Sequence, residues 1–377
     1  MTSLSTSRNV DRRLKELDGW RAFSVLLVIV HHLGTYRFRN FVAPHHHLVP
    51  LFEYIGPLGV KVFFVISGFV ICRLLILEEK KYGSVSLKGF YVRRAFRILP
   101  PLLLYLSTIL FLLSIGLILE QWWGVFTSAL FLYDLNPARV PGNLGSWFVG
   151  HTWSLAVEEQ FYVTFPTLWL LTRKIGRGRF FFGAFCLIVA WNLLAALSGS
   201  NTFTDQNARS GFACICCGVL LASVEEPARK IARAIPALLM AVVMLSFLWH
   251  PAEYFGWKSA LFDSLYLPPA IALMLTYFLE GESLWRTLLC SKLIQAVGVT
   301  SYGIYLWQEL FTAPPRFYFG AGRLIPDLLP LLLLIVPLSY LFVEKPAMRL
   351  GRTFSERLRQ TRLRRIANRP AYAEELK

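Results

Sequence analysis

The sequence predicts an all-α, polytopic integral membrane protein with about ten transmembrane helices. Of its 377 residues, 55% are hydrophobic and only 16% are charged, whereas a soluble globular domain contains about 25% charged residues. The mean hydropathy is +0.50, and the apolar residues gather in stretches long enough to cross roughly 30 Å of hydrocarbon. This composition excludes a disordered chain and a nucleic-acid-binding module, even though the net charge is +16.

The apolar stretches define the predicted spans in chain order. The sixth and seventh stretches are short, which leaves open that they are merged or re-entrant. We expect residues 20–345 to form one transmembrane domain, with a cytoplasmic segment before it (1–19) and a basic cytoplasmic tail after it (346–377). The ten predicted spans are 20–36, 55–77, 98–119, 152–172, 180–198, 211–224, 235–250, 259–279, 293–311 and 324–343.

The positions of the lysines and arginines predict the orientation. Cytoplasmic loops of membrane proteins are enriched in these residues. With the N-terminus inside, the inner segments hold 30 of the 39 lysines and arginines. We therefore expect a multi-pass protein of the cell (inner or plasma) membrane with both termini in the cytoplasm. The basic tail is expected to contact anionic lipids.

The first predicted span carries the strongest chemical signal. Arg21 and His32 are eleven positions apart, so they share one face of a helix and lie about 16 Å apart along its axis. Ionisable residues inside spans are expensive and point to function. The alternative is that Arg21 extends to the inner interface while His32 only hydrogen-bonds a neighbouring helix.

The sequence predicts no metal site, no bound cofactor and no acyl-enzyme. The cysteines at 214–217 lack paired metal-ligand spacing, and His45, His46 and His47 have no nearby carboxylate or cysteine. Ser67 lacks the glycine context of a nucleophile elbow, and we interpret it as a helix hydroxyl that bonds to the backbone.

Six stretches in this order resemble the motifs of the acyltransferase-3 family of integral-membrane O-acyltransferases. They extend over nearly the whole chain. The stretches are LDGWRAFSVLLVIVHH (17–32), FFVISGFVI (63–71), YVRRAFRILP (91–100), WSLAVEEQFY (153–162), SYGIYLW (301–307) and FVEKPAMRLGR (342–352).

The resemblance implies transfer of an acyl group, often acetyl, from cytoplasmic acyl-CoA to a hydroxyl. The acceptor would be a glycan or a related small molecule, and acyl-CoA would be a co-substrate. The expected partners are therefore acyl-CoA, the hydroxyl acceptor and membrane lipids, with no nucleic acid. One departure is Gln308, where many family members have histidine. We therefore do not assign position 308 as a base.

The family motifs and the chemistry together assign the catalytic pair. The R-x10-H pair of the family falls on Arg21 and His32, and its glutamate falls on Glu158. Histidine is suited to take the proton of an acceptor hydroxyl, and a carboxylate can orient the imidazole. We expect His32 as the general base and Glu158 as its orienting partner, at similar depth in the outer half of the membrane.

Further residues are assigned to substrate and donor binding. The R-x-x-R motif falls on Arg94 and Arg97, which share a helix face and, with Arg21, would supply cations for the phosphates of acyl-CoA. The alternative is the ordinary basic cluster of an inner boundary. Glu159 is expected beside the site, and Tyr302 and Tyr305 either line the acceptor site or pack in the core.

A transporter fits the composition and topology equally well. In that alternative, Arg21, His32 and Glu158 would relay protons while an acyl or glycolipid substrate moves. An enzyme consumes the thioester, whereas a transporter does not.

Overall fold

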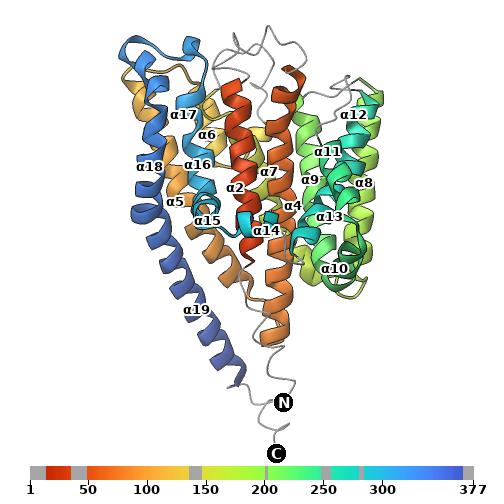
Figure 1. Ribbon diagram of the computed structural model, residues 1–377. Coiled ribbons are helices and arrows are strands. Elements are labelled where there is room, and N and C mark those ends of the chain that lie inside the picture. Colours follow the sequence, from red (N-terminus) through yellow and green to blue (C-terminus); the bar gives the residue numbers. More distant parts are fainter. Residues whose placement is uncertain are drawn as a thin grey trace, which may run out of the picture.

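The computed structural model describes residues 14–34, 49–135, 147–199, 203–247, 256–279 and 284–367, and within these ranges it contains helices and no strand. The helices stand side by side in a bundle (Figure 1). The structure therefore confirms the predicted all-α class. The principal elements are α2 (Lys15–His32), α4 (Val49–Tyr82), α5 (Leu87–Ser114), α6 (Trp122–Ala129), α7 (Thr152–Leu171), α8 (Arg177–Leu197), α9 (Phe203–Ser223), α10 (Glu225–Ala234), α11 (Ala237–Ser246), α12 (Trp257–Leu261), η4 (Phe262–Tyr266), α13 (Leu267–Leu279), α14 (Leu284–Leu289), α15 (Lys292–Val299), α16 (Ser301–Trp307), α17 (Glu309–Thr312), η6 (Gly320–Leu331), α18 (Leu332–Ser339), η7 (Tyr340–Glu344) and α19 (Lys345–Ala367).

The chain is a multi-pass membrane protein, and the length and apolar character of its helices show where it can cross. In the described part of the chain, five helices are long and apolar enough to span a membrane, or six if the bent pair α9–α10 forms one span. The predicted number of ten spans stays a prediction. The first predicted span falls outside the five because α2 includes four charged residues. The seventh falls outside because α11 is only 10 residues long.

The bundle has two ends, which we call the terminal end and the far end. The terminal end is where α2 begins at Lys15, α4 ends at Tyr82 and α5 begins at Leu87; α19 extends beyond it (Figure 1). The far end is where α2 ends at His32 and α7 begins at Thr152. α2 and α4 therefore connect the two ends through the middle of the bundle.

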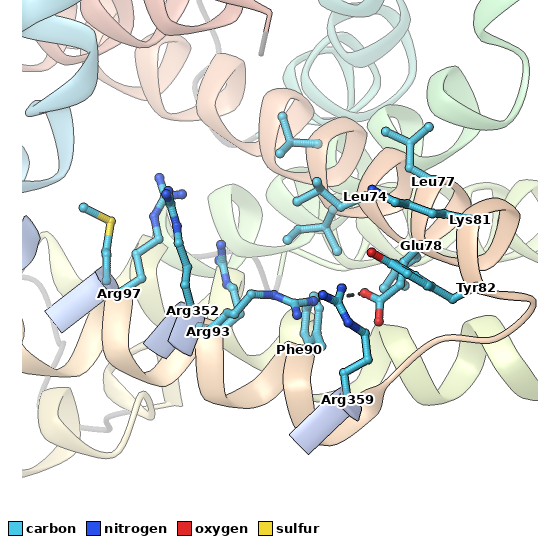
Figure 2. Close-up of a pocket in the computed structure, with 15 residues that line it drawn as sticks. Leu74, Leu77, Glu78, Lys81, Tyr82, Phe90, Arg93, Arg97, Arg352 and Arg359 are labelled. Atoms are coloured by element: carbon cyan, nitrogen blue, oxygen red, sulfur yellow. Dashed lines mark hydrogen bonds and ion pairs between the residues drawn. The ribbon is translucent and has the colours of Figure 1, made fainter. Parts of the chain in front are cut away.

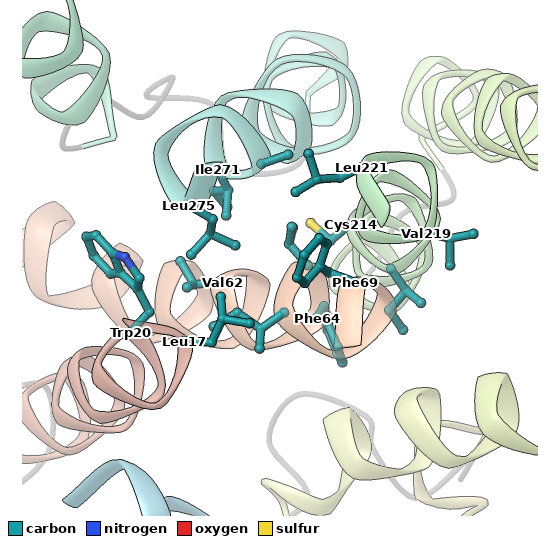
Figure 3. Packing of buried hydrophobic residues seen from close by; sticks show 14 of the residues in the cluster. Leu17, Trp20, Val62, Phe64, Phe69, Cys214, Val219, Leu221, Ile271 and Leu275 are labelled. Atoms are coloured by element: carbon teal, nitrogen blue, oxygen red, sulfur yellow. The ribbon is translucent and has the colours of Figure 1, made fainter. Parts of the chain in front are cut away.

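Close helix contacts hold the centre of the bundle together. A Cβ atom on Gly68 would lie 2.1 Å from the carbonyl oxygen of Ile215, and one on Gly218 would lie 2.1 Å from that of Val65. α4 and α9 can therefore approach to backbone contact only because each has glycine at the crossing. Around this crossing, buried side chains from α2, α4, α9 and α13 form a core (Figure 3), which includes Leu17, Trp20, Val62, Phe64, Phe69, Cys214, Val219, Leu221, Ile271 and Leu275.

A buried ion pair connects α4 to the η4 turn. Lys61 Nζ lies 2.6 Å from Asp263 Oδ1, and both side chains are almost fully buried. The Gln206 amide of α9 donates to the other carboxylate oxygen of Asp263 at 3.3 Å. Since a lone charge in the bundle would be costly, this pairing fixes how the two elements dock.

The described part of the basic tail is one helix that packs along α5. In α19, Gly351 lies against Phe96 of α5, and Phe354 contacts the Phe96 ring with centroids 5.8 Å apart. The Arg93 guanidinium donates to Ser355 Oγ at 2.5 Å. This part of the tail is therefore docked on the transmembrane domain as well as being basic.

Candidate active site

A small cavity opens at the far end of the bundle, where α2 ends and α7 begins. We call it the histidine chamber. Its volume is about 220 Å³. Its walls come from α2, α4, the start of α7, α16 and α17. The lining residues are Val28, His31, His32, Gly56, Pro57, Val60, Trp147, Gly150, His151, Trp153, Tyr305 and Glu309.

His32 has a polar oxygen at each nitrogen of its ring. Nδ1 lies 2.9 Å from Gln308 Oε1, and Nε2 lies 3.4 Å from Glu309 Oε1. The His32 side chain is 13% exposed and that of Glu309 is 4% exposed. The Thr312 hydroxyl also donates to Gln308 Oε1 at 3.2 Å, which holds the amide in place.

A second imidazole contacts the same carboxylate. His151 Nδ1 lies 3.6 Å from Glu309 Oε2, so Glu309 sits between the rings of His32 and His151. The Tyr305 hydroxyl bonds to the carbonyl oxygen of His151 at 3.0 Å and to Ser154 Oγ at 2.7 Å. Tyr305 lines the chamber, which is one of the two positions expected for it.

His31 points to a different neighbour. Its Nδ1 lies 2.6 Å from the carbonyl oxygen of Phe52, and its ring packs against Gly56 of α4. The rings of His31 and His32 are 4.9 Å apart at their centroids. The two consecutive histidines therefore share a cavity, and in it Glu309 lies 3.4 Å from His32 Nε2.

The structure corrects the predicted pairing of His32 with Glu158. The carboxylate beside His32 is Glu309, whereas Glu158 accepts hydrogen bonds from Ser67 and Tyr162. Ser67 and the α4 position beside His31, Gly56, are eleven residues apart, or about 16 Å along α4. The prediction that His32 and Glu158 lie at similar depth is wrong because α7 begins level with the chamber at residue 152. Glu158 therefore lies nearly two turns deeper in the bundle.

Glu158 belongs to a polar cluster between the two ends of the bundle. The Arg94 guanidinium lies 3.4 Å over the Tyr162 ring and contacts Glu159 Oε1 at 3.5 Å and Glu158 Oε1 at 4.0 Å. Ser67 bonds to the Glu158 side chain, so its predicted backbone bond is wrong. Glu159, predicted beside the site, is an ion-pair partner of Arg94.

A larger cavity opens at the terminal end, between α4, α5 and α19. We call it the basic pocket (Figure 2). Its volume is about 450 Å³, and it has six cationic side chains and one carboxylate, Glu78, on its wall. The lining residues are Val70, Ile71, Leu74, Leu75, Leu77, Glu78, Lys81, Tyr82, Phe90, Arg93, Arg94, Arg97, Met348, Arg352 and Arg359.

The structure separates the arginines that the sequence had grouped. Arg94 lines the pocket, but its charge is directed to Glu158 and Glu159. Arg97 has no ion-pair partner among the described residues. Arg93, which precedes the R-x-x-R motif, lines the pocket too and pairs with Glu78 at 3.0 Å. Positions 93, 94 and 97 lie within about 100° around the axis of α5, so all three arginines reach one cavity.

Arg21 and Tyr302, the remaining predicted site residues, line neither the histidine chamber nor the basic pocket. The Arg21 guanidinium lies 6.0 Å over the Phe63 ring, and its Nε is buried without a hydrogen-bond partner. The Tyr302 hydroxyl donates to the carbonyl oxygen of Ile98 at 3.0 Å, and its ring lines neither cavity. Three further histidines, 45–47, for which no metal was predicted, lie outside the described residues.

Sequence reasoning missed His151 and Glu309, although both gave a signal. Glu309 is the sole charged residue of the predicted span 293–311, and His151 directly precedes the span 152–172. The same rule that selected Arg21 and His32, that an ionisable residue in an apolar span points to function, would have selected Glu309.

The comparisons with known proteins agree on one chemistry. A family model described as an acyltransferase domain, of the acyltransferase-3 type, matches residues 14–344. The Staphylococcus aureus protein named O-acetyltransferase OatA (strain NCTC 8325) is 25% identical over 379 residues, which cover 90% of this chain and 58% of the relative. Bacillus subtilis YrhL, provisionally named a peptidoglycan O-acetyltransferase, is 26% identical over 394 residues, with 92% and 57% covered.

This chain spans less than three-fifths of the length of these relatives. A protein of S. aureus strain COL, provisionally named an O-acetyltransferase, shows the same relation, with 26% identity and coverage of 89% of this chain and 57% of the relative. No solved structure matches the chain.

Proposed function

Because the chain belongs to the acyltransferase-3 family, we propose that it transfers an acyl group, most simply acetyl, from acyl-CoA to a hydroxyl of a glycan or related acceptor. The observation that carries the proposal is the histidine chamber, in which Glu309 lies between His32 and His151. The printed names of the relatives, O-acetyltransferase and peptidoglycan O-acetyltransferase, favour acetyl as the group and a cell-wall glycan as the acceptor.

In this mechanism Gln308 sets the tautomer of His32. A neutral imidazole has one donor and one acceptor nitrogen, and the partner of one nitrogen fixes the role of the other. With Nδ1–H donating to Gln308 Oε1, Nε2 keeps its lone pair on the side of the ring where Glu309 Oε1 lies 3.4 Å away. An acceptor hydroxyl that enters the chamber would then donate to Nε2.

Glu309 stabilises the charge that the reaction creates. The acceptor oxygen attacks the thioester carbonyl carbon as His32 Nε2 takes the hydroxyl proton. The carbon–sulfur bond then breaks, and the imidazolium returns the proton to the CoA thiolate. A carboxylate 3.4 Å from Nε2 favours the imidazolium over the neutral ring. His151 Nδ1 faces the other oxygen of Glu309 at 3.6 Å, which is longer than a hydrogen bond.

The basic pocket is suited to hold the other end of the donor. CoA carries phosphate groups, which Arg97 on the wall of the pocket can bind. On α4, Val60 lines the chamber and Val70 lines the pocket, so the two cavities are about 15 Å apart along the helix. CoA holds its acyl group on a long flexible arm, which allows phosphates and thioester to bind in different cavities.

The charge distribution supports an orientation for this arrangement. The positive-inside rule places the arginine-rich terminal end, and with it the pocket, in the cytoplasm. The protein would then sit in the cell membrane with both termini inside, take acyl-CoA from the cytoplasm, and present the chamber toward the outside.

The test uses purified protein in lipid nanodiscs with acyl-CoA labelled on its acyl group and a panel of hydroxyl acceptors. Acyl transfer requires equal amounts of free CoA thiol and labelled ester. Movement of the label into the lumen of proteoliposomes with the thioester intact would establish transport and contradict the proposal.

A further inference from the structure

The side of α19 that faces the bundle carries a row of residues at helical spacing. Met348, Arg352 and Arg359 line the basic pocket, and Ser355 between them accepts from Arg93. All four lie beyond residue 344, where the match to the family model ends. Met348 and Arg352 still belong to the stretch 342–352 that resembles a family motif, whereas Ser355 and Arg359 lie beyond that stretch as well.

Acidic residues neutralise only some of the cations that line the pocket. Glu78, its one carboxylate, pairs with Arg93 at 3.0 Å and accepts from the backbone of Ser86 at 2.9 Å. Arg97 and Arg352 both line the pocket and have no ion-pair partner within the described ranges, and Figure 2 draws them on the same side of it. Like charges on the wall of one cavity repel each other, so this side of the pocket favours an anion with several negative oxygens.

The other side of the pocket combines a flat aromatic surface with charge. The Arg359 guanidinium lies 4.5 Å over the Tyr82 ring, and Lys81 Nζ lies 5.5 Å from its centroid. Leu74 and Phe90 add an apolar wall. Planar bases stack on tyrosine rings and on guanidinium planes. A phosphate-binding point next to a stacking surface matches a nucleotide.

The helix that carries these arginines is held in place. Phe354 packs on Phe96, and the contact from Ser355 to Arg93 continues to Glu78 of α4. α19 is thus fixed to both other walls of the pocket. Arg349, Arg352 and Arg357 are all exposed, but only Arg352 of these three lines the pocket. Arg349 and Arg357 are therefore left to meet lipid headgroups.

We propose that α19 completes the donor site, with Arg352 and Arg359 binding the phosphates at the nucleotide end of acyl-CoA, the 3′-phosphate included. This inference rests on the proposed function. The arginine side chains turned into the pocket then bind donor, and those turned outward remain for the membrane surface. Phosphate is the chemistry recognised, and a lipid headgroup is the competing source of it.

The experiment compares two double variants of the full chain that lose the same charge. Arg352→Gln with Arg359→Gln changes the pocket, and Arg349→Gln with Arg357→Gln changes the outward face of the helix. Glutamine keeps helix propensity close to that of arginine. Binding of desulfo-CoA, which lacks the reactive thiol, is measured by calorimetry in nanodiscs of zwitterionic lipid and of lipid with anionic headgroups.

The pocket variant should bind desulfo-CoA at least tenfold more weakly in both lipids, because two charge-assisted contacts are lost. Its discrimination between CoA and 3′-dephospho-CoA should shrink, and its kcat at saturating acetyl-CoA should stay near that of the wild type. The outward variant should change each quantity less than twofold. In wild-type protein, desulfo-CoA should slow hydrogen exchange over residues 348–359.

Unchanged desulfo-CoA affinity in the pocket variant, or a loss that appears only in anionic lipid, would overturn the inference and assign the arginines to lipid. The proposed acyl-transfer function would not be contradicted by that result. If wild-type protein neither bound desulfo-CoA nor released thiol, the proposed function itself would fail. If the pocket variant does not fold, unaltered hydrogen exchange over 348–359 in the wild type overturns the inference.

Discussion

The two cavities of this bundle differ in how their charges are satisfied. In the histidine chamber, Glu309 is shared by two imidazoles, and the second nitrogen of His32 faces Gln308. In the basic pocket, Arg97 and Arg352 have no acidic partner within the described ranges. The chamber is also the smaller, at about 220 Å³ against about 450 Å³.

This difference separates a site suited to chemistry from a site suited to binding. A group that transfers a proton needs a partner already in place, because reorganisation during the reaction raises the barrier. A group that binds an anion needs an unsatisfied charge, because a resident carboxylate would have to be displaced first. The cluster between the cavities follows neither pattern, since the charge of Arg94 is already paired with Glu158 and Glu159.

The largest loss of kcat is expected from substitution of His32. His32→Ala should lower kcat by about 10²–10⁴-fold, the usual contribution of a positioned base, and leave the affinity for acyl-CoA nearly unchanged. Steady-state kinetics of thiol release, with calorimetry of desulfo-CoA binding, separates the two quantities. His31→Ala is the matched control.

The His31 control should be much milder, because that ring contacts the carbonyl oxygen of Phe52. If His31→Ala and His32→Ala lowered kcat alike, the cavity would depend on packing of both rings and the base assignment would be wrong.

Glu309 should show the second-largest effect. Glu309→Gln removes the negative charge beside the His32 imidazolium and should lower kcat on the order of 10²-fold. Glu158→Gln, its control, changes a carboxylate about 16 Å away along the helix and leaves Arg94 paired with Glu159. A larger loss of kcat in Glu158→Gln than in Glu309→Gln would return the role of His32 partner to Glu158.

Substitution of Arg97 should change the affinity for acyl-CoA, whereas substitution of Arg94 should change the stability of the fold. Arg97→Gln should raise the apparent KM for acyl-CoA about tenfold with little change in kcat, because one phosphate contact is lost. Arg94→Gln should instead destabilise the fold by about 3–5 kcal/mol, since it leaves buried carboxylates unpaired. Thermal unfolding measured beside the kinetics distinguishes them, and equal KM effects without loss of stability would show that Arg94 also binds donor.

The sequence predicted the fold class and one side of each cavity. Charge pattern and motif spacing were sufficient to select His32, Arg94 and Arg97, which line the two cavities, because residues at fixed spacing within a single helix share a face. The positions of Glu158 and Glu309 depend on where α7 begins and on which helix packs against α2. Such relations between helices cannot be read from periodicity, so the carboxylate partner of His32 was assigned wrongly.

The orientation of the tail helix could not be predicted from the sequence either. Its basic composition predicted a membrane surface, but spacing alone could not say which arginines turn inward. The docking of α19 on α5 through Phe354 decides that.

The smallest effect in the chamber is expected at Gln308, the position where this chain departs from the usual histidine. Gln308→Leu removes the oxygen that accepts from Nδ1 of His32, and the loss of one hydrogen bond, worth about 1 kcal/mol, should lower kcat about fivefold. Gln308→His keeps a polar nitrogen at this position and should retain most of the activity. Since the proposed role is to set a tautomer, the pH profile of kcat should shift in Gln308→Leu but not in Gln308→His. An unchanged profile and rate in Gln308→Leu would mean that Glu309 alone orients the ring, and that the base nitrogen is Nδ1 and not Nε2.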